Sequence, residues 1–272
     1  QILRQCREEL HAKIEQQSKS LTVQGALLEV ANGRLFGVTA LLEAASRRFS
    51  AVRSDRRVPT VLVTGEIYNR LDPFANDFVV DKLAERGIGV QVSPFTEWIE
   101  YTDCINIKNG GIALGDRLSG AVRKRIQNLL YRAAAANLHW PPRIEVERIL
   151  QAAAPYLRDR LEGEAVLTVG SSLCEYGDGH VEGALITAPL ECMPGKIAEA
   201  QLLHLAEEKG LPSLTLALNG DPLDTEVLDA FAFEILGRFQ QRSLSVSGRA
   251  AGTRKPRRIH SVRAGALDQR TD

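Results

Sequence analysis

The stretch EGALITAPLECMPGKIAEAQLLHLAEEKGLPSLTLAL, residues 182–218, decides the fold. It opens with the apolar run GALITAPL, continues as a helical pattern from about Pro194 to Lys209, and ends with a second strand-like run, SLTLAL. A strand, a helix and a second strand in this order predict two parallel strands, because parallel neighbours need a long connection. The stretch therefore predicts a mainly parallel sheet covered by helices.

The same alternation is found upstream, from Pro59 onward. The runs TVLVT at 60–64 and GIGVQVS at 87–93 predict strands, separated by a helix over residues 74–86. Other helical patterns occur around Trp98, at 115–138, at 143–159 and at 224–240. This order of elements predicts a doubly wound α/β domain.

One segment, GEAVLTVGSSLCEY at residues 163–176, fits two interpretations. Val166, Leu167 and Val169 are typical of a strand, whereas the spacing of Val166, Val169 and Leu173 is typical of a helix. Periodicity alone leaves both open.

The two ends of the chain differ from the alternating part. Residues 1–58 carry amphipathic patterns, such as the apolar residues that recur every four positions from Ile2 to Ile14, and predict a helical lead-in. Residues 59–241 form the predicted α/β domain. Residues 242–272 hold eight Lys or Arg against two Asp, a net charge of +6, without an apolar period. They predict a disordered basic tail.

Composition bounds the class of protein. With 44% hydrophobic and 25% charged residues, the chain resembles an ordinary globular protein. Its apolar runs are much shorter than the roughly 20 residues that cross a bilayer, and no secretory leader is evident. The four cysteines are widely spaced, unlike those of a disulfide scaffold or of paired zinc ligands. These features predict a cytoplasmic protein.

The loops that follow the predicted strands indicate a site, since ligands bind at the carboxyl ends of parallel strands. One crevice could gather polar and thiol side chains from these loops: Glu66, Tyr68, Asn69, Asn76, Glu97, Cys192 and Asn219. Each also has a structural interpretation. Asn76 can cap the next helix, Asn219 can belong to a turn before Asp224, and Tyr68 and Trp98 can be core residues.

Cys192 has an unusual setting. Met193 and Pro194 open a helix, and the N–H groups and positive dipole end of a helix N-terminus favour a thiolate. A thiolate there could be a nucleophile or a metal ligand, whereas the alternative is an inert buried thiol. Lys196, one turn further along, could meet an anionic group or could be a solvated helix lysine.

A resemblance extends this interpretation. It is carried by GEIYNRLDPFANDFVVDKLAERGIGVQVSPFTEWIEYT, by LEGEAVLTVGSSL, and by EGALITAPLECMPGKIAEAQLLHLAEEKGLPSLTLALNGDPLDTEVLDAFAFEI. These segments, which run from about Pro59 to Phe239, resemble the C-terminal part of long CoA-substrate-specific enzyme activase fusions. That part is similar to the iron–sulfur D-component of 2-hydroxyacyl-CoA dehydratases and benzoyl-CoA reductases. The resemblance implies a helix at residues 163–176 and a flavodoxin-like sheet.

The resemblance also implies a function. In that family the cysteine of the C-M-P-G element, here Cys192, is a ligand of a [4Fe–4S] or double-cubane cluster that passes an electron to an acyl-CoA thioester. One thiolate cannot hold a cluster, because a cubane is typically bound by four. The missing ligands are expected from cysteines outside this chain segment, with packing roles for Cys104 and Cys174. The resemblance implies two partners: an ATP-hydrolysing activase, as N-terminal domains of the same polypeptide or as a separate subunit, and an enzyme that processes acyl-CoA. This sequence itself has no G-x-x-x-x-G-K-[ST] loop.

Two alternatives from other classes remain open. The domain could serve as a docking or scaffold domain of the activase fusion without its own cluster. The run RKPRR at 254–258 could bind the phosphate backbone of a nucleic acid, but it lacks interleaved aromatic residues and the rest of the chain is acidic.

Overall fold

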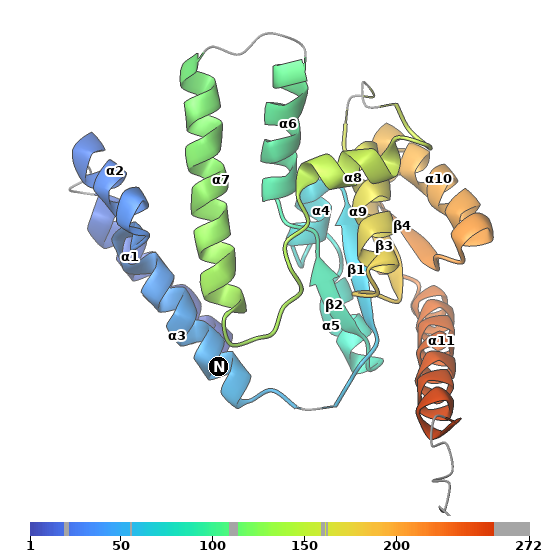
Figure 1. Ribbon diagram of the computed structural model, residues 1–272. Coiled ribbons are helices and arrows are strands. Elements are labelled where there is room, and N and C mark those ends of the chain that lie inside the picture. Colours follow the sequence, from blue (N-terminus) through green and yellow to red (C-terminus); the bar gives the residue numbers. More distant parts are fainter. Residues whose placement is uncertain (19–21, 55, 109–113, 159–160, 162, 253–272) are drawn as a thin grey trace, which may run out of the picture.

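The computed structural model describes residues 1–18, 22–54, 56–108, 114–158, 161 and 163–252. Within these ranges, four parallel strands form one sheet, in the order β2-β1-β3-β4 (Figure 1). The strands are β1 (Thr60–Gly65), β2 (Gly89–Val92), β3 (Gly183–Pro189) and β4 (Ser213–Leu218). The predicted parallel α/β fold is confirmed.

The strand order creates a switch point between β1 and β3. From β1 the chain adds β2 on one side, and then returns to add β3 and β4 on the other side. The loops that leave the carboxyl ends of β1 and β3 therefore diverge to opposite faces of the sheet. A crevice opens where such loops separate, so the fold places a candidate site after Gly65 and Pro189.

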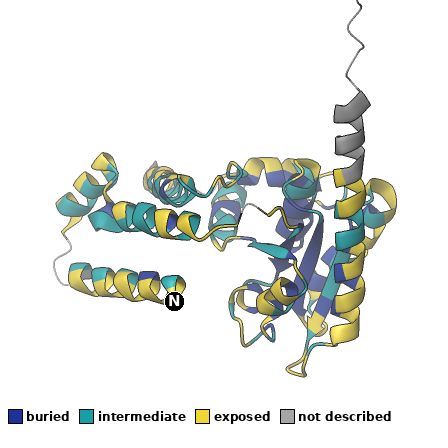
Figure 2. Cartoon of the chain, turned by 90° about the horizontal axis from the view of Figure 1, so that it is seen from below, coloured by how far each residue is buried: buried dark blue, intermediate teal, exposed yellow. Residues whose placement is uncertain are grey.

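Helices cover both faces of the sheet, which explains why the strands read as continuous apolar runs. On one face, α8 (Val146–Ala153), α9 (Ala165–Gly177) and α10 (Met193–Lys209) form a core with Ala184 and Ile186. On the other face, α5 (Val79–Glu85) and α11 (Thr225–Gly252) pack on Val61, Val63 and Leu185. The buried strands lie between these layers in Figure 2.

The segment with two interpretations is the helix α9. Residues 165–172 are all buried, whichever way they face. A helix that is buried around its whole circumference has no polar face, so its sequence loses the amphipathic period that identifies most helices. The resemblance predicted this helix, and periodicity could not.

The N-terminal residues form a helical arm, as predicted, but they do so together with a later helix. The arm contains α1 (Ile2–Ser18), α2 (Val23–Asn32) and α3 (Val38–Ala51), and α3 packs along α7 (Leu114–Ala135) (Figure 1). Asn137 Nδ2 donates to Ser46 Oγ over 2.7 Å, and Arg53 donates to the carbonyl of Leu138. The helix α6 (Thr96–Lys108) leads from the sheet to this arm.

One predicted boundary was wrong. The helix expected over residues 74–86 starts at Val79, because residues 73–78 form turns, with Asp77 and Phe78 at positive φ, after the separate short helix α4 (Ile67–Leu71). The helix α11 continues to Gly252, into the segment for which we predicted a disordered tail. Elongating an existing helix is far easier than nucleating one, and Arg242 anchors this part through an ion pair with Glu182 at 3.0 Å. The remainder of the predicted tail, residues 253–272, lies outside the described residues.

In the part of the chain that the structure describes, no single helix has the length and apolar character of a membrane span. The pair Val23–Asn32 and Leu35–Ala51 meets that test only when both are taken together, across a bend of 82°.

Candidate functional site

Three helix starts meet at the switch point. The N–H of Glu66, directly after β1, donates to the carbonyl of Thr187 in β3 over 2.8 Å. The backbone at Gly163, before α9, lies against the start of α10, since a Cβ at Gly163 would be 3.0 Å from Pro194 Cγ. The starts of α4, α9 and α10 therefore surround one edge of the sheet.

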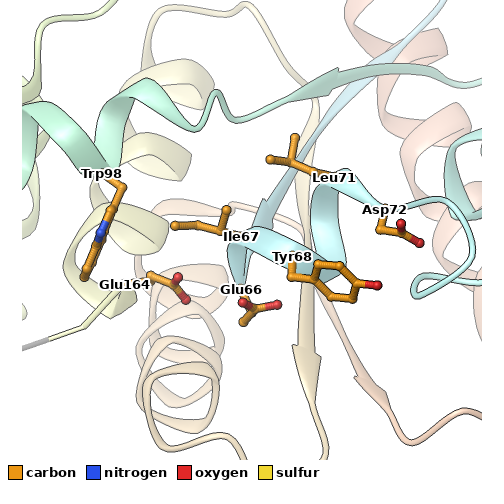
Figure 3. Close-up of a pocket in the computed structure, with 7 residues that line it drawn as sticks. All are labelled: Glu66, Ile67, Tyr68, Leu71, Asp72, Trp98 and Glu164. Carbon is orange, nitrogen blue, oxygen red and sulfur yellow. The ribbon is translucent and has the colours of Figure 1, made fainter.

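A cavity of about 540 Å³ opens at this edge (Figure 3). Its walls combine carboxylates, aromatic rings and aliphatic side chains, from Glu66, Ile67, Tyr68, Leu71, Asp72, Trp98 and Glu164. Tyr68 is 63% exposed at the rim, whereas Trp98 is partly buried and packs on Tyr101, with ring centroids 5.5 Å apart. The cavity is thus acidic, with an aromatic component.

Two carboxylates lie at the start of α4. Glu66 accepts a hydrogen bond from the N–H of Asn69 at 2.7 Å, and Glu164 faces the same helix start, where the N–H of Ile67 favours its charged form. Free N–H groups at a helix start attract such acceptors. Burial and repulsion by Glu66 nevertheless raise the pKa of Glu164 above its ordinary value. The two negative charges are therefore close enough to oppose each other.

Arg70 is a buried cation close to Glu66 and Glu164. Its side chain is only 2% exposed, and its guanidinium donates to the carbonyls of Gly65 at 3.1 Å and Pro94 at 3.3 Å. Its Nε has no partner among the described residues. Burial lowers the pKa of Arg70, while the charges of Glu97, Glu164 and Glu66 raise it. Arg70 hence links the carboxyl ends of β1 and β2 and partly offsets the negative charge around it.

Glu97, at the start of α6, is the most perturbed carboxyl group of this region. It accepts a hydrogen bond from Ser171 Oγ at 3.2 Å. Burial raises its pKa to about 7, although the nearby positive charge of Arg70 acts in the opposite direction. A carboxyl group with this pKa is partly protonated near neutral pH.

We expect Glu97→Gln to change the pH dependence of stability. Between the ordinary pKa of 4.5 and about 7, the folded state keeps a proton that the unfolded state has lost, so the free energy of unfolding falls as pH rises. Glutamine does not titrate, so the variant should not lose this free energy of unfolding as pH rises. Urea unfolding should show the variant more stable than the wild type by about 2 kcal/mol at pH 8, and nearly equal to it at pH 4.

The exposed Glu207 on α10 provides the control, since Glu207→Gln should change stability by less than about 0.5 kcal/mol at either pH. A pH-independent effect of Glu97→Gln would show that this carboxyl does not titrate with a raised pKa in the fold.

Cys192 caps α10 and is partly exposed at the same edge of the sheet. Its side chain makes no capping hydrogen bond. The neighbouring Gly195 is packed so tightly that an added Cβ would lie 2.6 Å from Ala188 Cβ and 3.7 Å from Cys192 Sγ. The helix start is therefore held close to β3, and the partly exposed thiol lies beside it.

The other thiols are elsewhere and have packing roles. Cys174 is buried in α9, where burial raises its pKa to about 11 and its Sγ–H points to the carbonyl of Arg148 at 3.8 Å. Burial also raises the pKa of Cys104 in α6. Cys6 is buried in the helical arm. All four cysteines are free. Among them, Cys192 is the one that follows a strand at the carboxyl edge of the sheet.

Several predicted site residues are held by local structure. Asn76 Oδ1 accepts from the N–H of Val79, and its Nδ2 donates to the carbonyl of Asn69, so it caps α5 and ties the preceding loop to α4. Asn219 forms a turn with Asp221, as the structural alternative predicted. Lys196 is exposed and pairs with Glu199.

Of the residues predicted to share one crevice, Glu66 and Tyr68 line the cavity, and Cys192 lies after the adjacent strand. Asn69 is buried in α4, and Asn76 and Asn219 do not line the cavity. Glu97 does not line the cavity, but it directly precedes Trp98, which does. The core interpretation of Tyr68 was wrong, because its ring is exposed.

Sequence reasoning missed Glu164 and Asp72, and it treated Trp98 as a core residue. Glu164 lies at the start of the segment whose helical nature was ambiguous, so its position as the residue before α9 could not be used. Asp72 ends a helix that was not predicted, and its carboxylate accepts from the N–H of Ala75. The signal that could have found Glu164 is its place after Gly163 and before an apolar run.

In comparisons with known proteins, the chain matches no protein-family model, no curated protein and no solved structure. The functional argument therefore rests on the residues and geometry of this edge.

Proposed function

We propose that the chain is an electron-transfer module of an ATP-dependent acyl-CoA dehydratase or reductase system, in which Cys192 supplies one thiolate ligand to an iron–sulfur cluster. The observation that carries the proposal is the position of Cys192. Cys192 is the N-cap residue of a helix of 17 residues at the switch point of a parallel sheet, and its thiol is partly exposed. Helix N-termini favour thiolates, and thiolates are the usual ligands of such clusters.

The described residues do not fit a whole cluster by themselves. Among them, no group of three or more His, Cys, Asp or Glu side chains is arranged to hold a metal ion. The proposal therefore requires the other thiolates to come from a partner, either a separate subunit or another part of a longer polypeptide. That partner would include the ATP-hydrolysing activase.

Iron binding tests the proposal. Cys192→Ala should lose most of the iron that is bound after anaerobic reconstitution with iron and sulfide, because its thiolate is removed. Cys104→Ala is the matched control, since this thiol is also partly exposed but lies on α6. Iron content and visible spectra should be measured for this chain alone and for the longest polypeptide or complex that contains it together with an activase.

A cluster shared with a partner would be supported by two results together: the chain alone binds little iron, and the complex binds iron that is lost only in Cys192→Ala. Equal iron in both variants would refute the role of Cys192. The absence of specific iron from every sample would refute the cluster.

The second candidate is a docking or scaffold domain without a cluster. It is favoured by the single thiol at the edge and by the apolar side chains that flank it, Leu190 at 57% and Met193 at 61% exposure. A stable complex with the activase that contains no iron would support it.

The proposed location is the cytoplasm, where free thiols such as the four in this chain persist. The basic run proposed for nucleic-acid binding, residues 254–258, lies outside the described residues. A gel shift that disappears on deletion of residues 242–272 would be needed to support that function.

A further inference from the structure

The cavity next to Cys192 has a charge that the proposed cluster ligand does not explain. The described residues that line it include the carboxylates of Glu66, Asp72 and Glu164, and no basic side chain. Arg70 is the nearby cation, but its hydrogen bonds go to backbone carbonyls and it does not line the cavity. The cavity therefore presents negative charge without a basic group of its own.

Two of the carboxylates lie at one helix start. Glu66 accepts the N–H of Asn69 in the first turn of α4, which orients it before any ligand arrives, and Glu164 lies at the same helix start. A carboxylate has about four lone-pair sites, so both keep acceptor capacity. Their mutual repulsion, which raises the pKa of Glu164, would be relieved by a positive charge placed between them.

The aromatic walls suit the same kind of ligand. Trp98 and Tyr68 flank the carboxylates on different sides (Figure 3). Aromatic faces attract guanidinium and ammonium groups, and they also pack against the aliphatic stems of Arg and Lys. Carboxylates and guanidinium groups form charge-assisted, often bidentate, hydrogen bonds.

We propose that this cavity receives an Arg or Lys side chain that a partner protein presents, with its charged end at Glu66 and Glu164 and its stem against Trp98 and Tyr68. The inference rests on the proposed function, because it describes how the partner that supplies the other cluster ligands is recognised at the same sheet edge.

The surroundings of the cavity favour a basic side chain of a protein over a free amine as its ligand. Tyr68, Leu71 and Phe74 follow one another along α4 and the loop after it, and they are 63%, 47% and 85% exposed. Apolar side chains gathered beside a charged cavity are typical of a protein contact site. The fitting occupant is thus a basic side chain with apolar neighbours.

The test uses arginine probes and the fluorescence of Trp98, in the 272-residue chain carrying Trp140→Phe to remove the second tryptophan. The probes are N-acetyl-arginine amide, the uncharged analogue N-acetyl-citrulline amide, agmatine, and a short peptide with one arginine between two phenylalanines. We expect saturable binding of the arginine peptide, weakened by salt, and no binding of the citrulline compound. Glu164→Gln should weaken binding by about tenfold, because a charge-assisted hydrogen bond is lost.

Glu191→Gln is the matched control, since this exposed carboxylate follows β3 at the same edge but does not line the cavity, and it should bind the peptide like the parent. Circular dichroism should verify that Glu164→Gln is folded.

Equal binding of the arginine and citrulline probes, or unchanged binding by Glu164→Gln, would overturn the proposal. Binding of agmatine as tight as that of the peptide would overturn the protein source and assign the cavity to a small organic cation. Cys192→Ala should leave binding of the arginine peptide unchanged while it removes the iron, so failure of this inference is distinguishable from failure of the cluster.

Discussion

Alanine in place of Gly170 is expected to destabilise the protein by about 3 kcal/mol. Gly170 lies in the buried helix α9, where α8 crosses it so closely that a Cβ would be 2.3 Å from the carbonyl oxygen of Ile149 and 2.7 Å from its Cγ2. Backbone atoms cannot move aside as the end of a side chain can, so the two helices must separate. The higher helix propensity of alanine, about 1 kcal/mol, offsets only part of this cost. Urea unfolding measures the difference.

Gly177, the last residue of the same helix, is the matched control. A Cβ at this position has no neighbour within 4 Å among the described atoms. Gly177→Ala should therefore be neutral or should stabilise by up to about 0.5 kcal/mol. If both variants were equally stable, α8 and α9 would not be in the close contact that we describe.

Gly65→Ala should cost about 3 kcal/mol or more and should also disturb the site. Gly65 ends β1 with a φ of 105°, which residues with a Cβ rarely adopt, and an added Cβ would lie 2.3 Å from the carbonyl oxygen of Thr187. Substitution would strain the backbone and force β1 away from β3 at the switch point. Unfolding measurements should be combined with arginine-peptide binding, which we expect to weaken because Glu66 follows directly.

Gly87→Ala separates these two causes. Gly87 also has a positive φ, 78°, but a Cβ there would meet no atom within 4 Å. It should show only the conformational cost, about 1 kcal/mol. If Gly65→Ala and Gly87→Ala lowered the free energy of unfolding equally, the close contact between β1 and β3 at Gly65 would add nothing to the cost of backbone strain.

The sheet was predictable from the sequence because its central strands, β1 and β3, are buried on both sides. Their runs TVLVT and GALITAPL have few polar interruptions, and each is followed by a segment of helical character. Short elements were not predictable. The helix α4 has five residues and is capped by Glu66, and Glu164 reaches the same helix start from a segment nearly a hundred positions away in the sequence.

The candidate site was predictable only where it follows a strand directly. Glu66 and Cys192 were identified in this way, because the carboxyl ends of β1 and β3 must be adjacent in a sheet of this order. Asn76 and Asn219 also follow strands, but both are used by local turns and caps. Glu164 follows no strand. Its place at the cavity depends on the packing of α9, and no local pattern encodes that packing.

The pairing of α3 with α7 has a consequence for how the chain is made. The ribosome completes α1, α2 and α3 long before it reaches Leu114, where α7 begins. During that interval the side of α3 that will contact α7 has no partner, while β1 and β2 already emerge. Chaperones that recognise exposed apolar helices would find their target in this nascent arm, and synonymous codons that slow translation between residues 52 and 113 would lengthen its exposure.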